Sequence, residues 1–166
     1  PRRLSVTAYA EWVLGAFRGV TAPFIVTEID PETGALFARN PWNPGFGERI
    51  AFADLGGRQT GWTGDRAEIL GRNGTLDAPA LLERGGRLSG KVGEGLDPCA
   101  VLQAVRELPP GGGQEFVFFL GQASSATDAR ALLARYRAGD LDLTLEAVRT
   151  HWDDILGAVQ VKTPDR

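Results

Sequence analysis

The sequence contains no methionine, one cysteine and one histidine among its 166 residues. A single cysteine, Cys99, excludes an internal disulfide and a zinc site built from several cysteines. A single histidine, His151, argues against a histidine-rich metal centre. We therefore expect neither a metal ion nor a cofactor. Cys99 is expected to be a small buried residue, and His151 to lie on a helix surface.

The lack of methionine also bears on the origin of the chain. A natural chain of this length that begins with proline and has no methionine is better explained as a segment than as a processed whole protein. We therefore expect a fragment of a longer polypeptide.

A strong charge of one sign and long apolar runs are missing as well. The formal net charge is -3, with arginines and acids interspersed, so we expect no nucleic-acid partner. The hydrophobic share of 43% is ordinary for a globular protein. No apolar run approaches the length of a membrane span, so we expect no membrane insertion by this segment. The opening PRRLSVTAYAEW alternates in polarity, unlike a signal peptide.

Alternating apolar residues predict antiparallel strands in the first third of the chain. Between residues 4 and 14 every second residue is apolar, as in a half-buried strand. These residues are Leu4, Val6, Ala8, Ala10, Trp12 and Leu14. Residues 24–28 and 35–39 are short apolar-rich runs joined by the turn sequence 29–34, which predicts a hairpin. A further short strand is expected at 49–54.

Glycine-rich turn chemistry then extends from residue 55 to 96. The helices expected there are two brief turns, residues 65–70 and 79–83. Regular alternation returns at 99–108, and residues 115–120 form a second strongly apolar run. The intervening Pro109 to Gly113 has turn chemistry, so we predict that these two runs pair as a β-hairpin.

The hydrophobic period changes at residue 123 and predicts two amphipathic helices. Ser125 and Asp128 resemble a capping box, and Gly139 stops the first helix. Its apolar face consists of Ala129, Leu132, Leu133 and Tyr136. The second helix ends at Pro164, and its stripe consists of Leu141, Leu145, Val148, Trp152, Ile155 and Leu156. Each broad apolar face must cover either the sandwich or a domain outside this chain.

Several segments in a fixed order resemble one known family. They are GDRAEILGRNGTLDAP, GLDPCAVLQAVRELPPGG and FLGQA, within a likeness that runs from RRLSVTAYAEWVLG to HWDDILGAVQVKTPDR. These segments resemble the β-sandwich domain of glycoside hydrolase family 94, which includes cellobiose and chitobiose phosphorylases. The resemblance is strongest to the cyclic β-1,2-glucan synthases of that family.

The resemblance implies a mainly β fold, an antiparallel β-sandwich fragment (supersandwich, galactose-mutarotase-like) followed by two C-terminal helices. It implies a partial sandwich domain at 1–122 and a helical linker at 123–166, leading to an (α/α)6 catalytic barrel outside this chain. The implied partners are that helical catalytic domain, a weakly bound glucan or oligosaccharide, and a second copy in a homodimer. The implied location is cytoplasmic, including the cytoplasmic side of a parent held in the inner membrane.

The strongest candidate for a binding surface is the stretch from 39 to 79, because so long an irregular segment is usually functional. The candidate substrate-binding residues are Trp42, Trp62, Asp65, Arg66 and Arg72. The indole rings could stack on a sugar face, and the guanidinium groups could contact hydroxyls or phosphate. The alternative is structural, with the tryptophans plugging the sandwich edge and Asp65 paired to Arg66. Trp12 and Trp152 are expected in the core.

No residue of this chain is assigned a catalytic role, because the resemblance implies that the catalytic aspartate lies in the barrel. The expected function is a non-catalytic, carbohydrate-associated domain of a glycosyltransferase or glycoside phosphorylase that acts on β-glucosides. One rival is a stand-alone carbohydrate-binding module, which requires Trp42 and Trp62 to be exposed on one surface. The other is a small glycosidase that uses Asp65 and Glu68.

Overall fold

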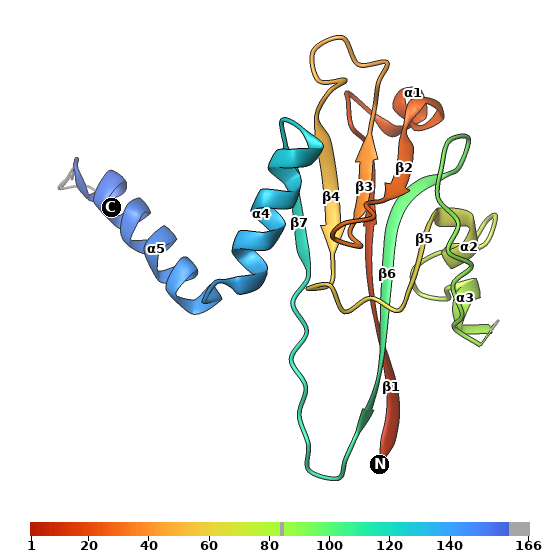
Figure 1. Cartoon of the computed structure of the whole chain (residues 1–166). Coiled ribbons are helices and arrows are strands. Elements are labelled where there is room, and N and C mark those ends of the chain that lie inside the picture. Colours follow the sequence, from red (N-terminus) through yellow and green to blue (C-terminus); the bar gives the residue numbers. More distant parts are fainter. Residues whose placement is uncertain (84, 160–166) are drawn as a thin grey trace, which may run out of the picture. The chain divides into compact units, whose positions relative to one another are not determined.

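The computed structural model describes residues 1–83 and 85–159. The chain divides into a compact unit, Pro1–Leu133, and a second unit that begins at Ala134. In the first unit the described strands form two antiparallel sheets, one of three strands and one of four (Figure 1). The predicted mainly β sandwich, followed by C-terminal helices, is therefore confirmed.

The three-stranded sheet has the order β1-β6-β5. Its strands are β1 (Arg2–Glu11), β5 (Gly61–Asp65) and β6 (Pro98–Leu108). β1 pairs with β6 over its whole length, from Arg2 opposite Leu108 to Glu11 opposite Cys99. The strand predicted at the start of the chain is confirmed, but it ends at Glu11 rather than Leu14, and none of its residues is fully buried.

The four-stranded sheet has the order β2-β3-β4-β7. Its strands are β2 (Val26–Ile29), β3 (Leu36–Arg39), β4 (Ile50–Asp54) and β7 (Phe119–Ala123). The predicted hairpin of β2 and β3 is confirmed, and Gly34 provides the positive φ of 72° that its turn requires. The predicted strand at 49–54 is confirmed as β4.

The main core lies between the inner faces of the two sheets. Because strand side chains alternate between faces, β3 and β4 send Leu36, Ala38, Ala51 and Ala53 inward. The facing residues from the other sheet include Ala100, Leu102 and Ala104, and Trp12 joins them at 5% exposure. The prediction that Trp12 is a core residue is confirmed.

Short helices cover the outer face of each sheet. On the four-stranded sheet, Phe37 and Phe52 pack with Ala129 and Leu133 of α4 (Ala126–Ala138). On the three-stranded sheet, Val101 packs with residues from α2 (Arg66–Leu70) and α3 (Ala80–Glu83). The two predicted helical turns are confirmed as α2 and α3. A further turn of helix, α1 (Arg18–Thr21), and the 3-10 turn η1 (Ala22–Phe24) connect β1 to β2.

The predicted hairpin of residues 99–108 and 115–120 is wrong. β6 pairs with β1 and β5, whereas β7 begins only at Phe119 and pairs with β4 in the other sheet. The Pro-Gly sequence at 109–113 does turn the chain, but the segment after it crosses from one sheet to the other. β5 is a strand that the glycine-rich pattern did not predict.

The two predicted C-terminal helices are confirmed as α4 and α5 (Leu141–Gly157). Ser125 Oγ accepts a hydrogen bond from Asp128 N at 3.1 Å, as in the predicted capping box. No residue of α5 is buried, and Trp152 is 54% exposed, so the prediction that Trp152 is a core residue is wrong. α5 ends at Gly157 rather than at Pro164, which lies outside the described residues.

Candidate functional site

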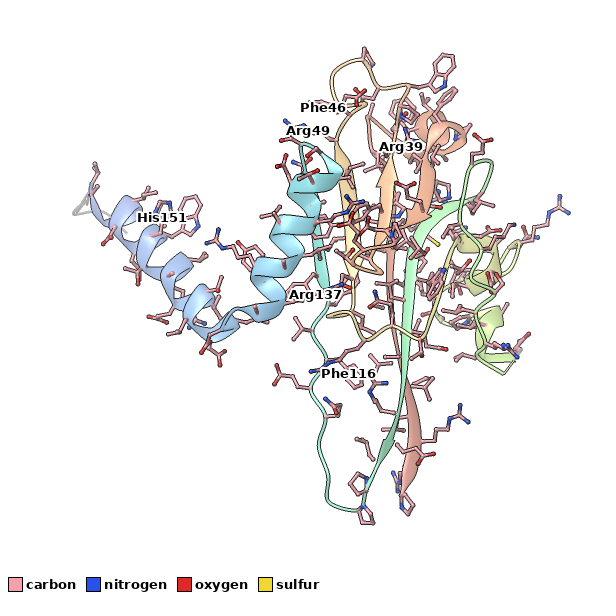
Figure 2. All side chains as sticks on the ribbon, viewed as in Figure 1. Arg39, Phe46, Arg49, Phe116, Arg137 and His151 are labelled. Atoms are coloured by element: carbon pink, nitrogen blue, oxygen red, sulfur yellow. The ribbon has the colours of Figure 1, made fainter. Side chains whose placement is uncertain are left out.

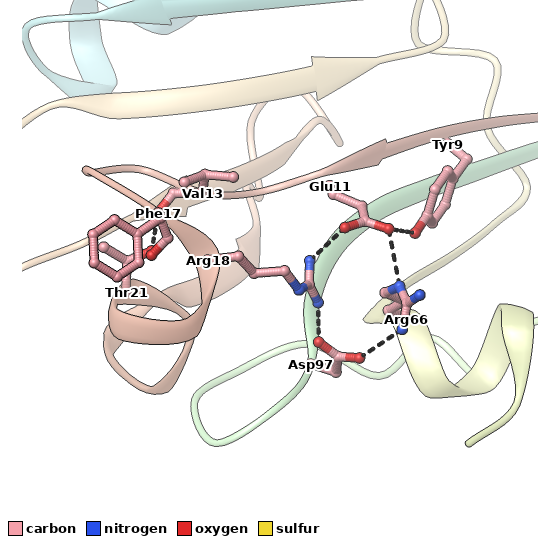
Figure 3. Close-up of polar contacts among 8 residues, drawn as sticks. All are labelled: Tyr9, Glu11, Val13, Phe17, Arg18, Thr21, Arg66 and Asp97. Atoms are coloured by element: carbon pink, nitrogen blue, oxygen red, sulfur yellow. Dashed lines mark hydrogen bonds and ion pairs between the residues drawn. The ribbon is translucent and has the colours of Figure 1, made fainter. Parts of the chain in front are cut away.

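Four charged side chains form a closed ring, here called the charge ring, at one end of the three-stranded sheet (Figure 3). It consists of Glu11, Arg18, Arg66 and Asp97. Glu11 accepts from Arg18 Nη1 at 2.7 Å and from Arg66 Nε at 2.9 Å. Asp97 also accepts from both arginines, from Arg66 Nη1 at 3.4 Å. Each carboxylate therefore faces two guanidinium groups, and the ring ties β1, α1 and α2 together.

Tyr9 completes the environment of Glu11. Its hydroxyl donates to Glu11 Oε1 at 2.5 Å. This hydrogen bond is the largest reason why the pKa of Glu11 lies below its usual value, and the two arginines act in the same direction. Burial, followed by the adjacent carboxylate, raises the pKa of Tyr9. The hydroxyl therefore stays a protonated donor, and Glu11 stays an anion held by its neighbours.

The other carboxylates of the candidate segment are engaged with separate partners. Asp65 caps α2 by accepting from Ala67 N at 3.1 Å, and it pairs with Lys91 Nζ at 2.8 Å. Glu68 accepts from the backbone N and the Oγ of Ser89, at 2.6 and 2.7 Å. Such contacts fix loops, and they do not poise two acids on opposite sides of one scissile bond.

The five sequence-predicted residues do not form one site. Arg66 belongs to the charge ring, Asp65 caps α2 beside it, and Arg72 is exposed just beyond the end of α2. Trp62 lies on β5 opposite Leu102 and packs partly buried against the main core. Trp42 is 74% exposed in the loop between β3 and β4, where its ring lies tilted against that of Phe24, with the ring centroids 5.1 Å apart. Only Trp42 therefore offers the open aromatic face that was predicted for both indoles.

A groove that sequence reasoning missed is formed in part by the β3–β4 loop, although Trp42 of that loop is not among its lining residues. Its volume is about 470 Å³, and its lining residues are Leu14, Gly15, Ala16, Asn40, Asn43, Phe46, Arg49, Ala51 and Gln122. They come from the segment after β1, the β3–β4 loop, β4 and β7. The loop residues lie inside the segment that the sequence singled out, whereas the approach of Gln122 depends on the pairing of β7 with β4.

The reactive side-chain types of the described chain are poorly placed for covalent catalysis. Cys99 is fully buried, and burial is the main reason why its thiol pKa is raised, so the thiolate nucleophile is disfavoured. His151 is exposed on α5, as predicted. Within the described residues, no group of three or more histidine, cysteine or acidic side chains could hold a metal ion.

The described helices also include none that is both long and apolar enough to cross a lipid bilayer.

Comparison with known proteins adds three findings. The family model described as "Glycosyl hydrolase 94, supersandwich domain" matches residues 1–139. Cyclic beta-(1,2)-glucan synthase NdvB of Rhizobium meliloti (strain 1021) is 39% identical over 165 residues, 99% of this chain and 6% of that protein. The 3-O-beta-D-glucopyranosyl-beta-D-glucuronide phosphorylase of Paenibacillus borealis is 32% identical over 97 residues, 58% of this chain and 12% of that protein. The chain thus spans a small part of the length of both relatives.

Proposed function

Because the chain belongs to the glycosyl hydrolase 94 supersandwich-domain family, we propose that it is a non-catalytic, carbohydrate-associated domain of a larger enzyme. That enzyme is a glycosyltransferase or glycoside phosphorylase, of the cyclic β-1,2-glucan synthase type, that acts on β-glucosides. The name of one relative gives a β-(1,2)-glucan as its product, and the name of the other gives a β-D-glucopyranosyl substrate, which supports β-glucosides as the substrate class. The same proposal includes a cytoplasmic location, which the family resemblance implies.

The observation that carries the proposal is the engagement of the candidate acids. Asp65, Glu68, Glu11 and Asp97 each accept hydrogen bonds from side chains or backbone groups that hold loops and helices in place. A glycosidase needs one carboxyl group that donates a proton and a second that activates water or attacks the sugar. Asp65 and Glu68 instead serve as a helix cap and a loop anchor, which favours a scaffold.

The partner that we propose is a helical catalytic domain of the parent protein, reached through the linker at 123–166. Support comes from α5, which carries an unpartnered apolar stripe among the described residues. The exposed members of the stripe are Leu145, Val148, Trp152, Ile155 and Leu156. A stripe of this size on an amphipathic helix favours a packed partner. A second copy of the chain is the competing occupant, in the homodimer that the family resemblance implies.

The stand-alone carbohydrate-binding module is the alternative function. It requires the rings of Trp42 and Trp62 to be open on one surface, and the partial burial of Trp62 against the main core counts against it. The exposure of Trp42 remains compatible with a sugar contact from the domain.

The test of the proposed function is an activity assay on the isolated 166-residue chain. β-1,2-Glucan and β-linked glucose disaccharides would be supplied with and without inorganic phosphate, and free glucose and glucose 1-phosphate would be measured. The expected result is no release above that of a heat-denatured sample. If the chain shows turnover, and both Asp65→Asn and Glu68→Gln abolish it, the non-catalytic function is wrong and the chain is a glycosidase.

The docking proposal has its own measurement. In a polypeptide that joins this chain to the helical domain of its parent, Trp152 should become protected from acrylamide quenching, compared with a Trp152→Phe variant. If Trp152 is already protected from acrylamide in the isolated chain at high concentration, and the chain has the mass of a dimer, then α5 packs against a second copy of the chain instead.

A further inference from the structure

We propose that the groove at the β3–β4 loop binds one glucosyl unit of a neutral saccharide, with Phe46 as the stacking face. The hydrogen-bonding side chains are Asn43, Arg49 and Gln122. The inference rests on the proposed function, since it names the sugar contact of that same domain.

The shape of the groove comes from small residues between larger ones. Gly15, Ala16 and Ala51 are among its lining residues, and Phe46 contributes a ring that is 58% exposed. Figure 2 shows Phe46 and Arg49 together at the loop end of β4, and the Arg49 guanidinium lies 5.1 Å from the ring centroid. A volume of about 470 Å³ falls within the usual range of small-molecule pockets, about 300–1,000 Å³.

The walls of the groove are held in position by hydrogen bonds. Asn40, which is buried, donates from Nδ2 to the carbonyl of Leu14 at 3.0 Å and so joins the β3–β4 loop to the segment after β1. Asn43 Oδ1 accepts from the backbone N of Gly45 and of Phe46, at 3.0 and 3.1 Å. These contacts fix the loop that presents Phe46, so the groove is preformed and a ligand need not order it.

The polar groups at the rim match the hydroxyl edge of a sugar. Asn43 Nδ2 and Gln122 Nε2 have no protein partner among the described residues, so both amides can donate. Arg49 Nη1 donates to Gln122 Oε1 at 3.4 Å, a long contact that leaves the planar guanidinium able to reach a hydroxyl. A pyranose ring has an apolar C–H face and polar edges, and this pairing of an aromatic ring with amides suits both.

A neutral sugar fits this lining better than an anion. Arg49 is the one cationic side chain among the lining residues, and its charge is shared between the Phe46 ring and Gln122. A phosphate site normally contains several cationic side chains or helix N-terminal amides that bind the phosphate oxygens.

The experiment titrates the ¹⁵N-labelled 166-residue chain with sophorose, the β-1,2-linked glucose disaccharide, up to tens of millimolar. The expected result is saturable shifts of the amides of residues 43–49 and of the side-chain amide of Gln122. Phe46→Ala should weaken binding about tenfold, in line with the loss of one stacked ring. Ala16→Leu, which fills the groove without removing any polar group, should weaken it comparably.

The matched control is Phe17→Ala, because Phe17 is similarly exposed at 62% and is absent from the groove lining. Its sophorose affinity should equal that of the wild-type chain. Saturable shifts that survive both Phe46→Ala and Ala16→Leu, or the absence of shifts in the folded wild-type chain, would overturn the groove as a sugar site. Inorganic phosphate that competes with sophorose for the same amides would point to an anion site instead.

Failure of this inference is distinguishable from failure of the proposed function. Release of glucose from sophorose in the titrated sample would disprove the non-catalytic function, whatever the shifts. If sophorose does not bind and no glucose is released, only the inference that the groove is a sugar site is wrong, and the non-catalytic function stands.

Discussion

Arg130 of α4 donates two hydrogen bonds to a single oxygen, Oδ1 of Asp30, from Nε at 2.9 Å and from Nη2 at 2.6 Å. Asp30 Oδ2 accepts from the backbone N and the Oγ1 of Thr33, at 2.9 and 2.6 Å. A carboxylate whose side chain is only 1% exposed is thus fully engaged. The ion pair between Asp30 and Arg130 connects α4 to the β2–β3 turn, which is 100 residues earlier in the chain.

The first prediction concerns this buried carboxylate. Asp30→Ala should lower the free energy of unfolding by about 3 kcal/mol, because it removes the turn-stabilising acceptor and leaves Arg130 without its buried partner. Glu32→Ala is the matched control, since Glu32 contacts Arg130 Nη1 at 2.9 Å but is 65% exposed. Urea denaturation of both variants measures the difference. Equal losses would show that burial of Asp30 is unimportant.

The second prediction is a loss of stability in acid. Burial alone would raise the pKa of Asp30, but hydrogen bonds from Arg130 and Thr33 outweigh it and leave the pKa below its usual value. The pKa of Glu11 is lowered too, first by Tyr9. Groups with lowered folded-state pKa values stabilise the fold above their unfolded pKa values, about 3.9 for Asp and 4.3 for Glu. That stability is lost as pH falls through the folded values.

Tyr9→Phe should therefore move the acid transition to higher pH. The variant removes the largest cause of the lowered pKa of Glu11 while keeping the ring. Thermal unfolding midpoints between pH 2 and 6 would measure the transition for the wild type and the variant. If the unfolding midpoints of the variant are lower by the same amount at every pH, Tyr9 does not act through Glu11.

Sequence patterns predicted the strands whose evidence is local. The alternation from Leu4 to Trp12 and the turn at Gly34 each specify their element within a few residues, and both are present. The partner of β6 was mispredicted because two adjacent apolar runs joined by Pro109 to Gly113 look like a hairpin. β6 instead pairs with β1, about a hundred residues away, and supplies Ala100, Leu102 and Ala104 to the main core, a long-range pairing that the local pattern does not specify.

In the candidate site, too, local sequence patterns did not predict contacts between residues far apart in the chain. The sequence marked Asp65 and Arg66 as a charged pair, but the partners of Arg66 are Glu11 and Asp97, 55 and 31 residues away. The groove was likewise beyond local reasoning, because Gln122 reaches it only through the pairing of β7 with β4. The loop part could have been found from Asn43 to Phe46, where an asparagine turn presents an aromatic ring.

The third prediction concerns a close approach in the four-stranded sheet. Gly121 of β7 lies opposite Phe52 of β4, and a Cβ at position 121 would meet the Phe52 ring at 2.5 Å. Gly121→Ala should therefore destabilise the fold by about 1–3 kcal/mol, because the buried ring must leave its position. Gly113→Ala, where a Cβ meets nothing within 4 Å, is the control and should be neutral. Chemical denaturation compares them, and equal stability of the two variants would contradict the steric argument.

The fourth prediction concerns α5 in the isolated chain. A helix of 17 residues with no buried side chain depends on its own propensity and its Asp140 cap, and isolated helices of this length are marginal in water. Backbone amides of α5 should therefore exchange with deuterium at least a hundredfold faster than those of β6, which lie in the buried sheet. Hydrogen exchange followed by NMR measures both in one sample. Asp140→Ala should speed exchange in α5 and leave β6 unchanged, because the cap oxygen accepts from Asp142 N and Leu143 N at the start of that helix. Protection of α5 equal to that of β6 would mean that the helix already has a packed partner in the isolated chain, and the unpartnered stripe would then lose its role as a docking surface.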